Sequence, residues 1–430
     1  MQKTLAAHVS WNDRARCQSM LDVIMLALTL ILANLRATML VFFLVRVAWV
    51  EIFLWLLVFV GVLWILKRDG WLAAYLHAWW KNWLLVVFVL LALLSMFWSI
   101  GFTVSLFRAL ELLFATLIAA YIGIRYRPAD LAGMLFWFGA IMLILSTALI
   151  LLVPNVGVME GAPFYGAWRG MYWHRNHLGS ITALISTVLF IRFILASQHR
   201  KSEGILDGIF YLLSLLVLYA TKSATGYILF ILLHFCVLCY VLWLKNFHRL
   251  QKRHYFVIVA IFIAGLIAIL LNLEFIFGLF NRDITLTGRV RLWDFLLEEI
   301  IPQRVWLGYG FGAIWTFKSF RLWAQQQIGW GSQPLIADNG FFDILLHLGA
   351  VGLLIFTGVL ITALIRSLRH AIYHKALIDF LPLLIMIYAL VANIPFSLFA
   401  ETEVFVWILL TAVLFMTLPE GAPASNPTIT

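Results

Sequence analysis

Long apolar runs are the feature that most restricts what this chain can fold into. Each run is close to the ~20 mostly apolar residues that a membrane-spanning helix needs. The runs are continuous, unlike the alternating segments of ~10 residues that form membrane β-barrels. Of the 430 residues, 64% are apolar and 12% are charged, whereas soluble domains have about 45–50% apolar and about 25% charged residues. The sequence therefore excludes a soluble enzyme and predicts an all-α polytopic membrane protein.

The runs predict about 12 transmembrane helices, with boundaries good to a few residues. They occupy approximately residues 20–45, 49–66, 82–98, 103–123, 131–153, 179–198, 205–221, 226–244, 256–273, 341–365, 376–395 and 403–418. The first pair is the least regular, because Arg36, Arg46 and Glu51 interrupt it. The residues before it contain no small-residue cleavage site, which favours a signal anchor over a removed signal peptide.

The distribution of Lys and Arg predicts the orientation. Twelve spans place both termini on one side of the membrane, and the connections on that side hold 17 of the 30 Lys and Arg residues but few acidic ones. We therefore expect both termini in the cytoplasm. This asymmetry accounts for the net charge of +10, so we expect no nucleic-acid partner.

We expect a single integral-membrane domain over residues 1–430, with two substantial segments on the outer side, 154–178 and 274–340. The second segment lies between the ninth and tenth helices. Loops of that length are usually functional or disordered, and its content of Trp, Gly and Phe favours an ordered, partly helical loop. Residues 419–430 are predicted to form a disordered cytoplasmic tail.

Cysteine and histidine give little support for a metal site. Cys236 and Cys239 lie in an apolar run without a second ligand pair, which favours packing over a metal or redox role. His174 and His177 have no evident third ligand, so a zinc site is only weakly indicated. We expect no metal and no cofactor.

Six basic residues lie in the large outer loop, on the side where basic residues should be depleted. They are Arg282, Arg289, Arg291, Arg304, Lys318 and Arg321. One interpretation is a solvated loop surface. The other is an anion site, because guanidinium groups bind phosphate through paired donors.

Residues 285–299 predict a capped amphipathic helix in this loop. Thr287 or Gly288 is the expected cap, and Arg289 lies in the first turn. The apolar face of this helix would consist of Leu292, Trp293, Leu296 and Leu297. Arg291 and Asp294 are spaced to form an ion pair. A cation in the first turn is unfavourable by a few tenths of a kcal/mol. The free N–H groups there favour an anion, so a bound phosphate would remove the conflict.

Alternating glycines follow at Gly308, Gly310 and Gly312. They permit positive φ or close backbone approach. The pattern is not a nucleotide-binding loop, because it lacks the Lys-Ser/Thr pair and the strand-to-helix context. A structural turn is the simpler interpretation.

Ionisable residues stand at the start of the tenth predicted span. Asp338 is either a helix N-cap or a catalytic group. Asp343 and His347 are four residues apart on one helix face, and ionisable residues inside a span usually face a cavity or one another. Gly349 and Gly352 would let neighbouring helices approach closely.

The shorter outer segment ends in a mixture of basic and aromatic residues. His174, Arg175 and His177 follow Trp168 and Trp173, a composition that suits contacts to sugar and phosphate. At another outer helix end lies Lys222, which is either an anion-binding residue or an interfacial lysine whose ammonium reaches water.

Together these blocks resemble the O-antigen ligase and polymerase superfamily of integral-membrane glycosyltransferases of bacterial surface polysaccharides. The loop position, the Thr-Gly-Arg-x-x-x-Trp stretch at 287–293 and the glycines at 308–312 are similar to the family signature. Asn339, Gly349 and Gly352 match a family pattern in which Asp338 takes the place of a histidine. The segment 174–179 and the pair Lys222-Ser223 are also similar to family blocks.

The resemblance implies a location in the bacterial inner membrane and a reaction at its periplasmic face. In ligases, which transfer glycan to lipid A core, the histidine is the expected activator of the acceptor hydroxyl. With aspartate there, the pattern is closer to the succinoglycan-type exopolysaccharide polymerases of rhizobia. The implied reaction joins polyprenyl-diphosphate-linked oligosaccharide repeats into exopolysaccharide. The implied partners are chain-length-regulating and export proteins and the lipid bilayer.

The resemblance also suggests roles for individual side chains. Asp338 would be the general base and Arg289 would stabilise the leaving diphosphate. Arg175, Lys222 and Arg291 are the expected diphosphate-binding residues, and the expected sugar or acceptor contacts are His174, His177, Trp173, Trp293, Tyr309 and Asn339. An O-antigen ligase, a transporter of lipid-linked sugars or polysaccharide, and a scaffold without chemistry of its own remain alternatives. A transporter is disfavoured because the polar residues gather on one side and no duplicated halves are evident.

Overall fold

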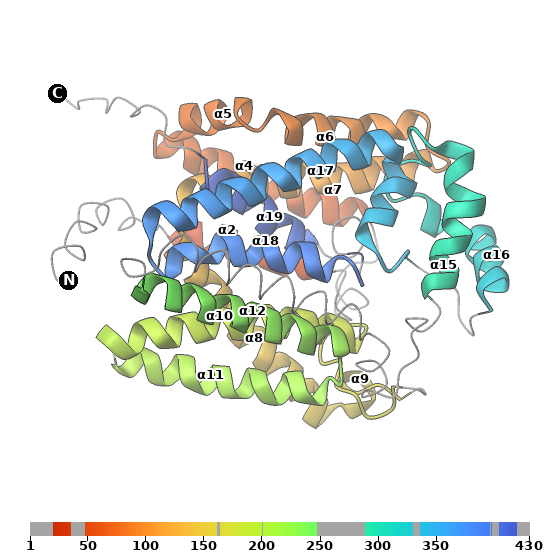
Figure 1. The fold of residues 1–430 in the computed structure, drawn as a ribbon. Coiled ribbons are helices and arrows are strands. Elements are labelled where there is room, and N and C mark those ends of the chain that lie inside the picture. The colour runs from red at the N-terminus through yellow and green to blue at the C-terminus, as the bar shows by residue number, and fades with distance from the viewer. Residues whose placement is uncertain are drawn as a thin grey trace.

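The computed structural model describes residues 20–35, 48–160, 164–199, 201–246, 289–329, 336–395, 397 and 404–418. Over these ranges the chain is built from helices (Figure 1). The longer ones are α2 (Met20–Leu35), α4 (Ala48–Arg68), α5 (Leu72–Trp80), α6 (Trp83–Leu94), α7 (Phe102–Arg125), α8 (Pro128–Leu152), α10 (Arg175–His199), α11 (Lys201–Ala220), α12 (Ala224–Asn246), α17 (Gly340–His374), α18 (Leu381–Ala392) and α19 (Val404–Met416). The shorter ones are α9 (Pro154–Gly157), α15 (Arg289–Phe295) and α16 (Lys318–Ile328).

Several of these helices are long and apolar enough to cross a membrane. The described residues contain six such helices, namely α4, α7, α8, α10, α12 and α17, or seven if α5 and α6, which meet at 84°, form one span. Shorter apolar helices lie in α2, α11, α18 and α19. The predicted all-α membrane fold is thus confirmed. The predicted number of about 12 spans is not established, because residues 256–273 and part of the first run lie outside the described residues.

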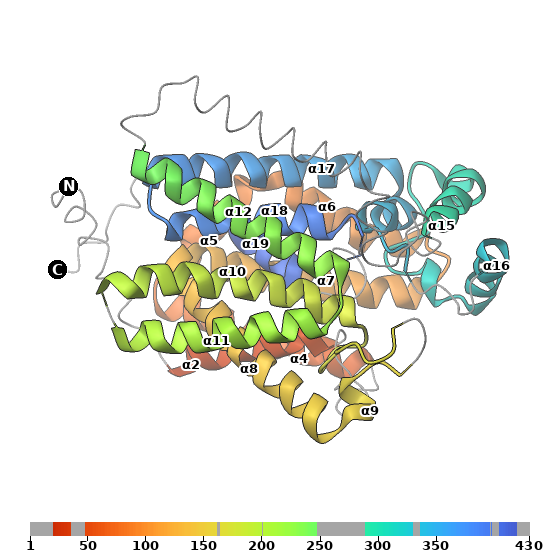
Figure 2. The same ribbon diagram turned by 60° about the horizontal axis from the view of Figure 1, so that its bottom comes forward.

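The helices begin and end at two opposite ends of the bundle. Figures 1 and 2 show α9, α15 and α16 at one end, and the junction of α10 with α11 at the other. At that second end Arg125 of α7 bonds Asp69, just after α4, with 3.0 Å between Nη2 and Oδ2. Arg366, near the end of α17, donates to Asn82 Oδ1 at 2.6 Å. The two predicted outer segments therefore share one end, while their orientation relative to the cytoplasm stays a prediction.

The main core runs through the helix bundle, and one of its aromatic clusters lies where α6, α17 and α19 meet. Phe88, Phe356 and Trp407, one from each helix, form a cluster with ring centroids 5.2–6.2 Å apart. All three side chains are buried. Nearly every residue of α19 is also buried, so it is a central helix, and α10 is covered in the same way along most of its length.

A second, smaller core belongs to the large outer loop. Leu292, Leu296 and Trp315 are buried there and pack with Ala337, just before α17, and with Leu346 in α17. The predicted amphipathic helix is present as α15, which begins at Arg289 and continues as a π-turn over Leu296–Ile300. Leu297, expected on the apolar face, is instead 48% exposed, because five helical residues place it on a different side of the helix from the buried Leu292. The expected cap, Thr287 or Gly288, lies outside the described residues.

The loop is fastened to α17 at a break in that helix. Gly349 has φ +65° and ψ −167°, which is not helical. Around it, the N–H groups of residues 350 and 351 donate to the carbonyls of Val305 and Trp306. The carbonyls of Leu346 and His347 in turn accept from the N–H groups of residues 309 and 310. Four backbone groups beside the break are thus bonded by one loop segment, 305–310.

Glycine is required on both sides of this junction. A Cβ at Gly349 would overlap the backbone of Trp306, so its close neighbour is the loop and not the adjacent helix that the sequence suggested. Gly308, Gly310 and Gly312 all have positive φ, as the sequence indicated. A Cβ at Gly308 would lie 2.5 Å from the carbonyl oxygen of Leu346. The alternating glycines are therefore a structural turn that lets the loop contact α17.

Gly349→Ala should destabilise the protein. A side chain there is strained by its φ and collides with the loop, and such strain costs about 1–3 kcal/mol. We expect heat-induced unfolding of the purified protein in detergent to shift several degrees lower. Gly133→Ala in α8 is the control, because no atom lies within 4 Å of its Cβ position and alanine favours the helix. Equal unfolding temperatures for the two variants would contradict this account of the break.

Candidate functional site

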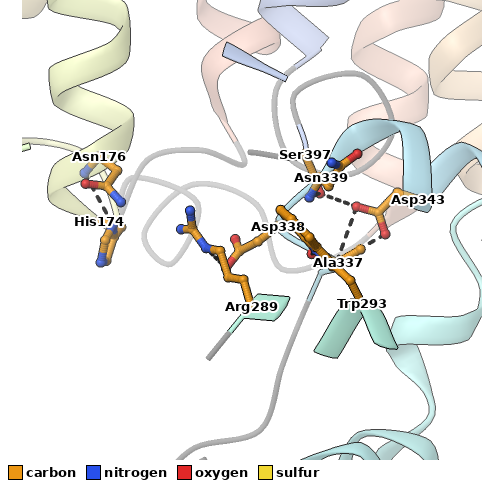
Figure 3. A network of polar contacts seen from close by, with 9 residues as sticks. All are labelled: His174, Asn176, Arg289, Trp293, Ala337, Asp338, Asn339, Asp343 and Ser397. Carbon is orange, nitrogen blue, oxygen red and sulfur yellow. Dashed lines mark hydrogen bonds and ion pairs between the residues drawn. The ribbon is translucent and has the colours of Figure 1, made fainter. Parts of the chain in front are cut away.

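An ion pair joins the outer loop to the entrance of α17. Arg289, the first residue of α15, places its Nε 3.0 Å from Oδ2 of Asp338. The two side chains are 13% and 21% exposed, respectively, so the pair is shielded but reachable from solvent. These are the two residues that the sequence analysis assigned to catalysis, and the structure brings them into direct contact (Figure 3).

Asn339, not Asp338, caps α17. Its side-chain oxygen accepts from the backbone N–H of Phe341 at 2.9 Å and of Phe342 at 3.2 Å. The expected N-cap role of Asp338 is therefore wrong by one residue. Asp338 itself lies in the left-handed region, at φ +52°. Its carboxylate is consequently turned away from the helix start and toward Arg289 (Figure 3).

Below this entrance, a fully buried carboxylate collects hydrogen bonds. Asp343 Oδ1 accepts from the indole N–H of Trp315 at 2.7 Å. The backbone N–H of Ala337 lies 3.2 and 3.3 Å from the two carboxylate oxygens. The hydroxyl of Ser397 donates to Oδ2, and its oxygen accepts from the backbone N–H of Asn339 at 3.1 Å. Sequence reasoning noted Asp343 but missed Ser397, which follows α18 and is more than fifty residues away along the chain.

Two aromatic residues proposed for sugar contact already have protein partners. Trp293 donates its indole N–H to the carbonyl of Ala337 at 2.8 Å, and its ring stacks on Phe342 with an interplanar angle of 17°. The hydroxyl of Tyr309 donates to the carbonyl of Ile300 at 2.8 Å. Burial raises the pKa of Tyr309 above its usual range, against an opposing effect of Arg304, so the phenol stays a donor. Any sugar would meet only the remaining ring surfaces.

A second group of candidate residues forms where α10 begins. The Nη1 of Arg175 donates to the carbonyls of Thr221 and Lys222, and its guanidinium lies over the ring of Phe164, with 4.4 Å to the centroid. Arg175 is only 3% exposed, and its Nε has no hydrogen-bond partner among the described residues. Lys222, at φ +50°, is exposed, with Nζ 3.4 Å from the carbonyl oxygen of Tyr165.

The neighbouring polar residues of α10 fix its first turn. Nδ1 of His174 accepts from the backbone N–H of Asn176 at 3.3 Å, and the side chain of Asn176 accepts from the hydroxyl of Ser223 at 2.9 Å. His177 is buried, whereas Trp173 is 37% exposed. In the view of Figure 3, His174 and Asn176 lie across from the Arg289–Asp338 pair. The structure thus forms two groups, one from the start of α10 and the turn between α11 and α12, and one from α15 and the residues just before α17.

The other candidates lie apart from these contacts. Arg291 is exposed, and no hydrogen bond or ion pair joins it to a described residue. Arg282 lies outside the described residues. Within the described ranges, no group of three or more His, Cys, Asp or Glu side chains could hold a metal ion.

Comparison with known proteins finds a matching family and a similar protein. A family model described as O-Antigen ligase matches residues 209–357, a range that contains Lys222, Arg289, Asp338 and the break in α17. The exopolysaccharide production protein ExoQ of Rhizobium meliloti (strain 1021) is 26% identical over 294 residues. Over these residues the chain is thus similar to the O-antigen ligase family and to ExoQ. The match covers 66% of this chain, which spans 64% of the length of that relative.

The O-antigen ligase match includes much of the loop-to-helix junction but stops at Thr357, in the middle of α17. Arg175 and Ser397 lie outside the matched range. The residues that the sequence resemblance singled out, Asn339, Gly349 and Gly352, lie inside it. Two of these have structural roles in the present protein, since Asn339 caps α17 and Gly349 admits the loop.

Asn339→Ala should weaken the start of α17. Loss of an N-cap side chain costs about 1 kcal/mol, and here two backbone N–H groups lose their acceptor. We expect a lower unfolding temperature for Asn339→Ala and a smaller decrease for Asn339→Asp, which keeps an acceptor oxygen. If both substitutions were equally harmless, the cap would not contribute to stability.

Proposed function

We propose that this protein polymerises polyprenyl-diphosphate-linked oligosaccharide repeats into exopolysaccharide at the outer face of the inner membrane. The observation that carries the proposal is the contact between Arg289 and Asp338 at the mouth of the helix bundle. The contact places a guanidinium, which can bind a diphosphate, beside a carboxylate, which can accept a proton, on a helical membrane scaffold. The name of the Rhizobium meliloti relative, an exopolysaccharide production protein, supports the same class of product.

Asp338 would act on the acceptor sugar. Its carboxylate would take the proton of the attacking hydroxyl, while that oxygen forms a bond to the anomeric carbon of the donor. The bond from this carbon to the diphosphate oxygen breaks, and the electron pair leaves with the polyprenyl diphosphate. Direct displacement inverts the anomeric centre. Proton transfer of this kind contributes about 10²–10⁴-fold to the rate.

Arg289 would act on the leaving group. A guanidinium presents several N–H donors in a fixed fork, so it can keep contact with Asp338 and still donate to a phosphate oxygen. Because negative charge grows on the diphosphate as the bond breaks, a fixed donor there lowers the barrier.

The group at the start of α10 would hold the rest of the lipid diphosphate. Arg175 carries a buried N–H without a described partner, and the ammonium of Lys222 is exposed beside it. Arg291 would add positive charge at the rim. His174, His177, Trp173, Trp293, Tyr309 and Asn339 would border the sugars. Chain-length-regulating and export proteins would work beside the enzyme.

A ligase is the second candidate, because the matching family model is described as O-Antigen ligase. The two reactions share the donor and differ only in the acceptor. Reconstitution into liposomes separates them. Growth of the lipid-linked repeat supports a polymerase, whereas transfer to added lipid A core supports a ligase. Movement of the lipid across the bilayer without a new glycosidic bond would instead indicate a transporter, and no reaction at all a scaffold.

Asp338→Asn should abolish chain extension while leaving the protein level unchanged. The amide keeps the size of the side chain but cannot take a proton. We expect a decrease of at least ~10²-fold, measured as polymer formed from lipid-linked repeats extracted from cells that lack this protein. Asp294→Asn, which removes an exposed carboxylate of α15, is the matched control. Wild-type polymer length in Asp338→Asn would remove Asp338 from the mechanism.

Arg289→Ala should weaken binding of the lipid diphosphate. Hydrogen bonds to charged groups contribute about 1.5–3 kcal/mol, so we expect the dissociation constant of polyprenyl diphosphate to rise about 10- to 100-fold. Arg369→Ala removes an exposed positive charge from the opposite end of α17 and should leave binding unchanged. Unaltered binding in Arg289→Ala would reassign this arginine to a structural role.

A further inference from the structure

We propose that Asp343 is a positioning residue that sets the carboxylate of Asp338 for proton transfer, through the backbone on both sides of it. The inference rests on the function proposed above. Asp343 is fully buried at the base of the entrance of α17. It lies five residues from Asp338 along the chain, and Figure 3 shows it bonded to Ala337 and Ser397 close to Asp338.

On the N-terminal side, Asp343 binds the chain directly. The backbone N–H of Ala337 lies within 3.3 Å of both carboxylate oxygens. The carbonyl of the same residue accepts from Trp293 at 2.8 Å. Ala337 is itself fully buried, so both polar groups of the residue before Asp338 are fixed by side chains.

On the C-terminal side, Asp343 acts through one hydroxyl. Ser397 donates to the carboxylate and accepts from the N–H of Asn339 at 3.1 Å. The next N–H, that of Gly340, is held by the carbonyl of Asn393 at 3.0 Å. Residues 337 and 339 are therefore both tied to a single buried carboxylate, and Asp338 is the residue between them.

The backbone of Asp338 shows why such ties are needed. At φ +52° a residue with a side chain pays about 1–2 kcal/mol relative to the right-handed region. A strained conformation persists only where its surroundings determine it. The bonds to Ala337 and Asn339 supply that constraint. Without them, Asp338 would relax to negative φ and its carboxylate would leave Arg289.

A carboxylate suits this position better than any neutral group. Trp315, Ala337 and Ser397 all present hydrogens to it. A carboxylate is an acceptor on both oxygens, whereas an amide turns one of them into a donor. Asp343→Asn therefore keeps the volume of the side chain but cannot keep all of these hydrogen bonds.

The test separates the rate of the chemical step from substrate binding. The probe is the lipid-linked repeat extracted from cells that lack this protein, supplied to purified variants in liposomes. For Asp343→Asn and for Ser397→Ala we expect kcat to fall about 10²-fold, because a misplacement of about 1 Å costs that much, while KM changes less than about 3-fold. Ser397→Thr keeps the hydroxyl and should restore kcat. Ser397→Ala, which leaves the buried carboxylate in place, tests the proposal even if Asp343→Asn does not fold.

Trp315→Phe is the matched control. It removes a donor to the same carboxylate and some packing of the loop core, but leaves both ties to residues 337 and 339. It should lower the unfolding temperature without lowering kcat by more than about 3-fold. An equal loss of kcat in Trp315→Phe and Asp343→Asn would overturn the positioning role, because general destabilisation would then explain both.

A double-mutant cycle gives the second readout. Because Asp343 acts through Asp338, Asp343→Asn should lower kcat far less in an Asp338→Glu background than in the wild type. Fully additive losses would overturn the inference. If Asp338→Asn is inactive and Asp343→Asn keeps wild-type kcat, the positioning role fails and the proposed function stands. If Asp338→Asn stays active, Asp338 is not the base, and the proposed function fails at that step whatever the kcat of Asp343→Asn.

Discussion

A helix inside a membrane can be broken only where other groups bond the amides and carbonyls that the break exposes. In α17 this condition is met at Gly349 by the loop segment 305–310. Each backbone group left unbonded in a buried place would cost about 1–3 kcal/mol. The four hydrogen bonds between this segment and α17 fix the position of the loop along the helix. The arrangement of the outer loop therefore depends on them.

The candidate site is a consequence of that attachment. With segment 305–310 held against residues 346–351 of α17, the rest of the loop folds back over the start of the same helix, where Leu292 and Trp315 pack around Ala337. Arg289 then stands at the first turn of α15, directly opposite Asp338. The ion pair thus joins two parts of one loop, and the polar residues at the start of α10 and in the turn between α11 and α12 form a separate group at the same end of the bundle.

The sequence predicted the membrane fold, the two outer segments and the main charged residues, because apolar runs and displaced arginines are local signals. It also indicated positive φ at Gly308, Gly310 and Gly312, which glycine alone suggests. It placed the cap of α17 one residue early, since Asp338 and Asn339 are both good caps and only the backbone decides between them. It could not find Ser397 beside Asp343, because that contact depends on how α18 packs. Nor could it foresee that Trp293 and Tyr309 donate to backbone carbonyls within the loop.

The left-handed backbone at residue 338 also restricts the chemistry available there. Apart from glycine, the residues that adopt this conformation most readily are asparagine, aspartate and histidine. Of these, only aspartate and histidine have a titratable side chain that can act as a proton acceptor. The resemblance to O-antigen ligases pointed to histidine at this place, and the chain has aspartate. Under the function proposed here, this backbone therefore allows either of two proton acceptors, aspartate or histidine, at residue 338.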